Sequence, residues 1–419
     1  MNDGWVRGDH FGLDMPAHAD ALRSGGPQFL TEVFRASGAL GPDDSVTAVT
    51  GLTEFRGGST GRKALLSVAY DRAELPMELF AKFSRDFDDP ARDIGRTQME
   101  FEVRFALLSR TPEFPIAVPT CLFADYHAPS GTGLLITDRI PYGDNGIEPQ
   151  YHKCMDYAMP DPVGHYEALL GALGRLAGTH KSGRLPTELV EHLPVDMKQL
   201  SVGERVPYTA EQLQRRVDRL AEFASAQPGL LPANLRSPAF LSRLRDEVVR
   251  FPTREEAIWD RLAADADYVA LCHWNANVDN AWFWRSGGNL ECGLMDWGCA
   301  GQMNVAMAIW GAMCSAETEL WDRHLDDLLD VFRKEFSAAG GPALASDVMK
   351  QHLMLYVAIM GLAWLLDVPS YLLRLLPERV SDRFDPQIAD NEQARSRLLM
   401  MTNLLNLWET NDFVGALDD

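Results

Sequence analysis

The stretch from residue 268 to residue 298 constrains the fold most, because it contains three strand-like segments, of which the middle one is Ala281–Arg285 and the outer two lead into polar side chains. The first, Tyr268–Cys272, leads into a polar loop at 273–280, and the last, Leu290–Met295, leads into Asp296. A carboxylate at the end of an apolar strand is costly unless it is paired or bound to a metal, which makes Asp296 the strongest candidate site residue. Carboxylate and amide oxygens suit Mg²⁺, which commonly keeps substrate phosphates among its ligands. The stretch therefore predicts a site for a divalent cation and a phosphate chain.

The residues between about 45 and 140 predict a small, β-rich lobe. Apolar, strand-like segments recur there, and one helical segment interrupts them. The expected strands are Ser45–Leu52, Lys63–Tyr70, Glu78–Phe83, Ile116–Pro119, Cys121–Ala124 and Gly133–Ile140, and the expected helix is Asp93–Arg110. The glycine-dense segment Glu54–Gly61 between the first two strands predicts a hairpin. Residues 1–44 are expected to form an N-terminal extension with a short amphipathic stretch.

After Pro141 the pattern changes, and residues 141–419 predict a larger, mainly helical lobe. The leucines of His165–His180 fall on one stripe of a helix. A charged, helical insertion is expected near 200–262. The longest apolar run, Leu353–Leu366, has 14 residues, which is too short to cross a bilayer and is typical of a buried helix.

The amino-acid composition limits which binding partners and which cellular compartment are expected. The chain has 39 Lys and Arg against 60 Asp and Glu, a net charge of −21. Nucleic acid is therefore not expected as a main partner, because phosphate backbones are bound by clustered basic residues. The six cysteines form no C-x-x-C pair, which predicts reduced thiols in a cytosolic protein. With no charged-then-apolar leader at the N-terminus, we expect a soluble, cytoplasmic protein without a membrane span. The oligomeric state stays open.

The order of these motifs resembles that of the aminoglycoside phosphotransferase and choline kinase-like superfamily, a branch of the protein-kinase fold. Its members carry H-G-D-x-x-x-x-N on the catalytic loop, followed by an apolar strand that ends in [IL]-D-[FW]. His273, Asn280 and the pair Asp296-Trp297 occupy the matching positions in this chain. The similarity runs from about residue 45 to residue 315. It implies an α+β, two-lobed, protein-kinase-like fold with a small β-rich N-terminal lobe and a larger, mainly helical C-terminal lobe.

The resemblance also implies which residues would hold a nucleotide and a metal ion. Lys82 would hold the α- and β-phosphates, Glu102 would pair with Lys82, and Asn280 and Asp296 would bind Mg²⁺. Backbone groups of the glycine-dense turn would lie over the phosphates, and a hinge after the last strand of the lobe would bind the base. The residues of these two segments are Gly57, Gly58, Ser59 and Thr60 in the turn and Thr137, Arg139 and Ile140 in the hinge. The cofactors implied are ATP or GTP, together with Mg²⁺.

The catalytic loop departs from the family pattern where the chemistry would take place. The catalytic Asp of the family is Asn275 here, which cannot accept a proton, and two further acidic positions hold Gly298 and Gln302. General-base assistance is typically worth about 10²–10⁴ in rate, whereas positioning and charge neutralisation supply most of the catalysis of phosphoryl transfer. Asn275 would still contact the acceptor. Asp279 would either supply a nearby carboxylate or only cap a turn, and His273 would either take part in catalysis or hold the loop.

These features leave more than one function open. The expected function is an ATP-dependent enzyme that transfers the γ-phosphate to a hydroxyl group of a small molecule. The alternative is a catalytically degenerate pseudokinase that acts as a nucleotide- or ligand-binding module, which the Asn at position 275 favours. A third possibility keeps the nucleotide but transfers another group, such as AMP. The sequence does not identify the acceptor.

Overall fold

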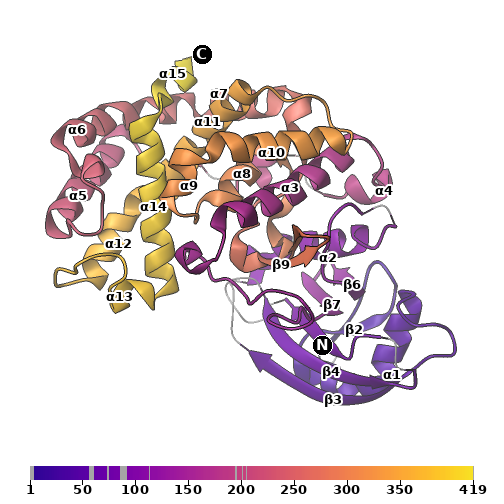
Figure 1. The fold of residues 1–419 in the computed structure, drawn as a ribbon. Coiled ribbons are helices and arrows are strands. Elements are labelled where there is room, and N and C mark those ends of the chain that lie inside the picture. Colours follow the sequence, from indigo (N-terminus) through magenta and orange to yellow (C-terminus); the bar gives the residue numbers. More distant parts are fainter. Residues whose placement is uncertain are drawn as a thin grey trace. The chain divides into compact units, whose positions relative to one another are not determined.

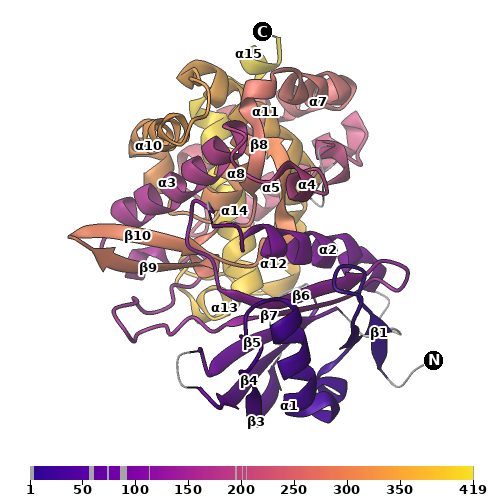
Figure 2. The same ribbon diagram turned by 90° about the vertical axis from the view of Figure 1, so that its right-hand side faces the viewer.

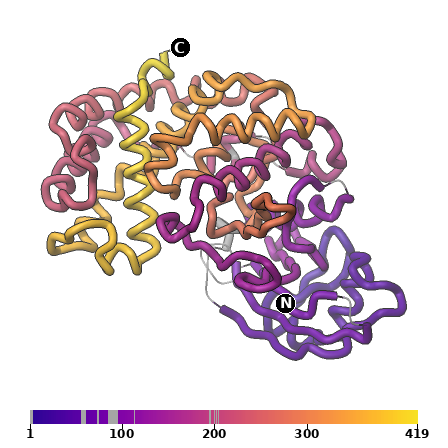
Figure 3. The backbone as a smooth tube through the Cα atoms, viewed as in Figure 1, coloured from indigo at the N-terminus to yellow at the C-terminus, as the bar shows by residue number. Residues whose placement is uncertain are grey.

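The computed structural model describes residues 4–55, 61–72, 75–84, 92–112, 114–193, 196–200, 202–203 and 205–418. Of residues 92–95 and 199 it describes the backbone alone. The chain divides into two compact units, which Figure 3 allows the reader to follow by colour. The first unit contains Met1–Glu148, Gly183–Pro194 and Gly293–Gly301, and the second contains Pro149–Ser182, Val195–Cys292 and Gln302–Asp419.

A five-stranded antiparallel sheet forms the centre of the first unit, with the strand order β3-β4-β5-β7-β6. Its strands are β3 (Val46–Phe55), β4 (Arg62–Tyr70), β5 (Glu78–Phe83), β6 (Cys121–His127) and β7 (Thr132–Asp138). The unit also contains β1 (Trp5–Arg7), β2 (Asp14–Pro16), α1 (Ala19–Ala36), α2 (Arg92–Leu108) and the short helix α4 (Thr187–Val190). Most of the predicted strands and the predicted helix of this lobe are therefore present, with bounds that differ by a few residues.

Two expectations for this unit need qualification. The segment Ile116–Pro119 is not a strand of the sheet; within it Ala117 forms only an isolated parallel bridge with Gly293. The hairpin of β3 and β4 is present, and Phe55 pairs with Lys63 next to its turn. The turn residues predicted to bind phosphate, Gly57, Gly58, Ser59 and Thr60, lie outside the described residues.

The sheet is covered by α1 on one face and by α2 on the other. On β5, Ala81 and Phe83 point into the core that the sheet shares with α1, which Figure 2 shows beside the sheet. Because successive side chains of a strand point to opposite faces, Lys82 faces α2. Leu135, which pairs with Lys82 on β7, packs in the core under α2. The alternation of β5 thus decides which helix can supply a partner for Lys82.

Residues 4–44 belong to this unit through α1. Phe29, Leu30 and Val33 of α1 are buried in the core that also contains Leu66 and Ile136 of the sheet. The amphipathic stretch expected near these residues is thus a helix that covers the sheet.

Helices make up most of the second unit. They are α3 (Pro162–Lys181), α5 (Ala210–Ala226), α6 (Pro238–Glu247), α7 (Glu255–Ala264), α8 (Val305–Met313), α9 (Thr318–Arg323), α10 (Leu325–Ala338), α11 (Ser346–Trp364), α12 (Val368–Leu375), α13 (Pro386–Ala389), α14 (Glu392–Thr410) and α15 (Phe413–Asp418). Of these, α3 and α10 lie side by side, as Figures 1 and 2 both show. Gly174 and Gly178 permit this close approach, because a Cβ atom at either position would meet backbone oxygens of α10 at 2.6 and 2.1 Å. The predicted α+β class, with a sheet in the N-terminal unit and mainly helices after it, is confirmed.

Residues 269–304, which include the polar loop and Asp296, contain four short strands. They are β8 (Val269–His273), β9 (Ala281–Ser286), β10 (Asn289–Leu294) and β11 (Ala300–Asn304), of which β8 pairs with β11 and β9 with β10. Short 3₁₀ helices follow β8 and β10, namely η7 (Val278–Asn280) and η8 (Trp297–Cys299). The strand β11 was not predicted.

The apolar run predicted to be a buried helix lies in α11. By length and composition the stretch Ser346–Leu375 could cross a membrane, but 83% of its most apolar window is buried inside the structure. Leu353, Tyr356 and Ile359 are among its fully buried side chains. The stretch therefore serves as a core helix of the second unit.

Candidate functional site

The ammonium of Lys82 lies between two carboxylates of the first unit. Its Nζ atom donates to Oε2 of Glu102 at 2.5 Å and to Oδ1 of Asp296 at 2.8 Å. Lys82 and Glu102 are almost fully buried, and the side chain of Asp296 is 24% exposed. The structure thus brings together three of the residues predicted from the sequence, and of these three Asp296 alone is partly exposed to solvent.

Local structure explains why these three side chains meet. Lys82 faces α2 through the alternation of β5, and Glu102 lies on α2 one residue before Val103, which packs against the sheet. Asp296 follows β10 and is held on both sides. Before it, the Leu294 N–H donates to the Ala117 carbonyl at 3.0 Å. After it, the ring of Trp297 stacks on Phe105 of α2, with ring centroids 3.6 Å apart.

The backbone of Asp296 has left-handed angles, with φ 62° and ψ 62°. A non-glycine residue rarely adopts this conformation, although Asp and Asn do so more readily than other residues. Strained backbone of this kind is concentrated at functional sites, where the surrounding structure holds it in place. The stacking of Trp297 and the bond of Leu294 supply that restraint here.

The charges of this cluster depend on one another. Burial alone would lower the pKa of Lys82, but Asp296 and then Glu102 outweigh burial and raise it above its ordinary value. Burial raises the pKa of Glu102, and the ammonium of Lys82 partly opposes that increase. Lys82 is therefore a permanent cation that is held at a fixed position by two acidic residues.

The predicted hinge residues lie at the end of β7. Thr137 is buried, and its hydroxyl donates to the carbonyl of Asp138 at 2.9 Å. The Arg139 N–H donates to the Glu78 carbonyl at 3.1 Å, while its side chain is exposed. Ile140 is half-buried. The structure thus places these residues at and just after the end of β7, which lies between β5 and β6 in the sheet.

The second unit holds the predicted catalytic loop in a network of asparagines. The side-chain amide of Asn280 donates to the backbone carbonyl of Asn275 at 2.9 Å, and that of Asn277 donates to Oδ1 of Asn275 at 3.1 Å. Asn277 is fully buried and also accepts a hydrogen bond from Ser315 at 2.6 Å. The loop conformation is therefore fixed by its own side chains, and His273 lies fully buried at its start.

Several residues of this loop's surroundings were missed by the sequence analysis. The ammonium of Lys153 pairs with Asp279 at 3.9 Å, and Asp279 raises the pKa of Lys153 against the opposing effect of burial. Asn277 and Ser315, described above, were also not predicted. Neither Lys153 nor Ser315 belongs to a motif, because only the folded chain brings them to the loop. Of these residues, only Asn277 could have been predicted from the sequence, because it lies among the other asparagines of the loop.

Each unit presents one predicted metal ligand of the oxygen type that Mg²⁺ prefers. The described residues contain no group of three or more His, Cys, Asp or Glu side chains that could hold a metal ion alone. Mg²⁺ is commonly bound through one or two protein oxygens together with substrate phosphates and water. The carboxylate of Asp296 in the first unit is an oxygen ligand of this kind. In the second unit the amide oxygen of Asn280 is another, because its amide nitrogen is already used within the loop.

Comparisons with known proteins add a likeness of structure. No protein-family model matches the chain, and no curated protein matches its sequence. Among solved structures the chain is similar to a spectinomycin phosphotransferase in complex with ADP and spectinomycin, with 12% identity, a TM-score of 0.40, and coverage of 88% of this chain and 93% of that chain. It is also similar to a choline kinase from Cryptosporidium parvum Iowa II, with 13% identity, a TM-score of 0.39, and coverage of 86% and 93%.

A third solved structure belongs to a microcompartment-associated aminopropanol kinase. It shares 13% identity and a TM-score of 0.42 with this chain, over 90% of this chain and 95% of that one. Identities of 12–13% and TM-scores of 0.39–0.42 are too low to assign a substrate or an activity. In structure, the chain is similar to these small-molecule kinases at that low level.

Proposed function

We propose that this protein is a nucleotide-dependent phosphotransferase that acts on a hydroxyl group of a small molecule. The observation that carries the proposal is the burial of Lys82 between Glu102 and Asp296. A buried ion pair is weak evidence for stability, because the cost of desolvating its charges often exceeds their attraction. A cluster of this kind, next to a strained Asp296, is better explained as a site where fixed charges meet a charged ligand.

In this proposal each residue has one role. Lys82 binds the α- and β-phosphates of ATP or GTP as a point charge, and Glu102 keeps Lys82 in position. Asp296 and Asn280 hold Mg²⁺ together with phosphate oxygens. The ion, when bound, neutralises charge on the phosphoryl group that is transferred. Thr137, Arg139 and Ile140 are proposed to bind the base of the nucleotide.

The transfer itself forms a bond between the acceptor oxygen and the γ-phosphorus and breaks the bond from that phosphorus to the bridging oxygen of the nucleoside diphosphate. The acceptor hydroxyl must also lose a proton. Asn275 can orient this hydroxyl but cannot take the proton, and the nearby carboxylate of Asp279 is paired with Lys153. In this proposal the proton passes to an oxygen of the transferred phosphoryl group or to water. Because the transition state of phosphoryl transfer is loose, positioning is sufficient for a reduced rate.

The second candidate is a binding module that holds nucleotide without transferring phosphate. The arrangement of the catalytic loop favours it, because the Asn275 side chain is engaged by Asn277 and the Asp279 side chain by Lys153. Such a loop is rigid but has no carboxylate at the position of the expected base. Transfer of another group, such as AMP, is the third candidate and would differ only in its products.

Thermal-shift titration separates these candidates from a chain that binds no nucleotide, since a ligand that binds the folded state stabilises it by mass action. We expect Mg·ATP or Mg·GTP to raise the Tm of the wild type and not of Lys82→Met. Lys350→Met is the matched control, because Lys350 pairs with Asp326 on the surface of the second unit. Absence of a shift with both nucleotides would reject the phosphotransferase and the nucleotide-binding module alike.

A second measurement distinguishes transfer from binding alone. The wild type and Asn275→Asp are incubated with Mg·ATP and a panel of hydroxyl compounds, and products are identified by mass spectrometry. If Asn275→Asp restores the missing base, we expect its rate to exceed that of the wild type by about 10²–10⁴. Nucleotide binding without any product from either protein would leave the binding module, and an adenylylated product would indicate AMP transfer.

A further inference from the structure

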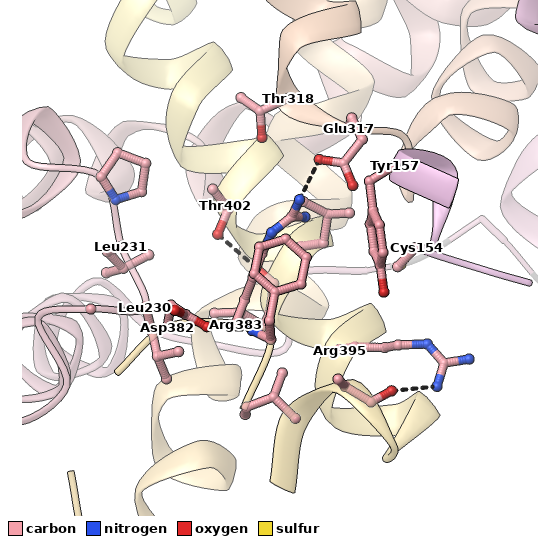
Figure 4. Close-up of a pocket in the computed structure, with 17 residues that line it drawn as sticks. Cys154, Tyr157, Leu230, Leu231, Glu317, Thr318, Asp382, Arg383, Arg395 and Thr402 are labelled. Carbon is pink, nitrogen blue, oxygen red and sulfur yellow. Dashed lines mark hydrogen bonds and ion pairs between the residues drawn. The ribbon is translucent and has the colours of Figure 1, made fainter. Parts of the chain in front are cut away.

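A cavity of about 340 Å³ lies within the second unit. Its lining includes Cys154, Tyr157, Leu231, Glu317, Arg383 and Phe384. Figure 4 labels Cys154, Tyr157, Leu231, Glu317 and Arg383 around the cavity, together with Arg395 and Thr402 of α14. This volume is at the lower end of the range of roughly 300–1,000 Å³ that is typical of small-molecule sites.

Two aromatic rings form one wall of the cavity. Tyr157 and Phe384 meet edge to face with their ring centroids 5.1 Å apart, and the Arg383 guanidinium lies 4.7 Å from the centroid of Phe384. Both rings are about half exposed, although large hydrophobic side chains are usually covered in a folded protein. An aromatic wall of this kind binds flat, apolar compounds.

The charges of the cavity cancel. Glu317 pairs with Arg383 at 2.7 Å, marked by a dashed line in Figure 4, and the other charged lining residues are Asp382 and Arg395. The lining therefore carries two acidic and two basic side chains, which gives no attraction for a polycation. One acceptor atom is left over: Oε1 of Glu317 is buried and has no hydrogen-bond partner among the described residues. A ligand that donates one hydrogen bond would satisfy it.

Two chain segments connect this cavity to the catalytic loop within the second unit. On the first, Lys153 pairs with Asp279 of the loop and the next residue, Cys154, lines the cavity. On the second, Ser315 donates to Asn277 of the loop and Glu317, two residues later, lines the cavity. Two segments that contact the loop therefore continue directly into the lining of the cavity.

The two segments that run from the loop to the cavity, 153–154 and 315–317, each have a fixed backbone conformation. Cys154 has a left-handed backbone with φ 61°, which is unusual for a non-glycine residue and is concentrated at functional sites. The N–H of Glu317 donates to Oδ2 of the fully buried Asp156 at 3.2 Å, and Tyr166 donates to the same oxygen at 2.9 Å. Asp156 is thus a positioning residue for the segment that presents Glu317.

We propose that this cavity binds the acceptor, and that the acceptor is a neutral or singly charged alcohol with a flat, apolar ring and one hydrogen-bond donor for Glu317. This inference rests on the proposed function, because it takes the catalytic loop beside the cavity to be the place of transfer. The proposal excludes polycationic compounds as acceptors. The overall charge of −21 does not predict the acceptor, since the cavity itself is balanced.

The test measures binding by calorimetry with indole-3-ethanol and tyrosol as aromatic alcohols and with choline and kanamycin as cationic comparisons. In the presence of Mg·ADP, we expect an aromatic alcohol to bind the wild type. Glu317→Gln and Phe384→Ala should each weaken that binding by roughly tenfold or more, because they remove a charge-assisted hydrogen bond or an aromatic contact. Phe384 is half exposed, so its truncation does not open the core.

Glu319→Gln is the matched control, because Glu319 lies two residues from Glu317, is exposed, and pairs with Arg323 outside the cavity. It should bind as the wild type does. The proposal is overturned if kanamycin or choline binds and neither aromatic alcohol does, or if aromatic binding is the same in Glu317→Gln, Phe384→Ala and the wild type. The nucleotide titration with Lys82→Met reports separately on the proposed function, so that an intact Mg·ATP response with no aromatic binding rejects this cavity alone.

Discussion

The ammonium of Lys82 lies 2.8 Å from a carboxylate oxygen of Asp296, although 214 positions of the sequence separate the two residues. Lys82 ends a strand of the central sheet, and Asp296 returns to the same unit in the segment Gly293–Gly301. Glu102 completes the cluster from α2. The contact between Lys82 and Asp296 joins two distant segments of the first unit. We therefore expect the stability of this unit to depend on the geometry of the site.

Lys82→Met should destabilise the protein mainly through the acid that it leaves behind. Removal of one partner from a buried ion pair typically costs about 3–5 kcal/mol, because the other charge stays buried without compensation. The double variant Lys82→Met/Glu102→Leu should recover much of this loss. Urea unfolding of both variants measures the difference in the free energy of unfolding. Equal stability of the single and double variants would show that Glu102 is not the source of the cost.

Asp296→Asn should remove the metal-dependent part of nucleotide binding while it preserves the fold. Asn tolerates the left-handed backbone at this position nearly as well as Asp, whereas Ala does not. We therefore expect Asp296→Ala to be less stable than Asp296→Asn by about 1 kcal/mol. Calorimetric titration with ATP in the presence of Mg²⁺ or EDTA checks the first point. A metal-dependent gain in affinity that persists in Asp296→Asn would contradict the assignment of Asp296 as a metal ligand.

Asp156 should make stability fall as pH rises through the acidic range. Burial raises the pKa of Asp156 from 3.8 to about 7, while the hydrogen bond from Tyr166 opposes that increase. Between these values the folded state binds more protons than the unfolded state, so stability decreases from about pH 4 to about pH 7. The loss is on the order of a few kcal/mol, since each pKa unit corresponds to about 1.4 kcal/mol.

Asp156→Asn should lack this decrease, because Asn does not titrate. Urea unfolding at several pH values compares the variant with the wild type, and the exposed Asp327→Asn serves as the control. If the stability of the wild type and of Asp156→Asn changes in parallel between these pH values, Asp156 is not the group responsible.

Gly298 should tolerate a small side chain but not an acidic one. A Cβ atom at this position would lie 3.4 Å from Cβ of Gln98 and 3.8 Å from Oε2 of Glu102, which is ordinary contact. Gly298→Asp would therefore add a third carboxylate to the cluster of Glu102 and Asp296, and like charges in a buried site repel strongly. We expect Gly298→Asp to be less stable at neutral pH than Gly298→Asn, which has the same shape without the charge. Thermal unfolding measures this, and equal Tm values would show that charge is not the reason for Gly at this position.

The absence of an acidic residue at position 298 is thus matched by an acidic neighbour in the structure. In the sequence, Gly298 was only a departure from a family pattern. In the structure, it is a position whose neighbours include the carboxylate that pairs with Lys82. The pattern could show that an acid was absent, but only the packing shows what an acid there would meet.

Short strands were the elements that sequence patterns could not reveal. The strand β5 was predicted with its observed bounds, Glu78–Phe83, because four of its six residues are apolar and they follow a turn-like segment. The strands β1, β2 and β11 have three to five residues, which is too short for a period of two to be recognised. Ile116–Pro119 was predicted as extended and is not a strand, since only Ala117 finds a partner, Gly293.

The sequence by itself determined the local properties of this protein. It determined which segments alternate as strands, that the apolar stretch in α11 would be buried, and that Asp296 would follow an apolar strand. These properties depend on side chains within a few positions of each other. The tertiary structure alone decided which charges meet: Lys82 with Asp296, Lys153 with Asp279, and Glu317 with Arg383. Each of those pairs joins distant segments, and their contact depends on how whole helices and strands pack, which no local pattern records.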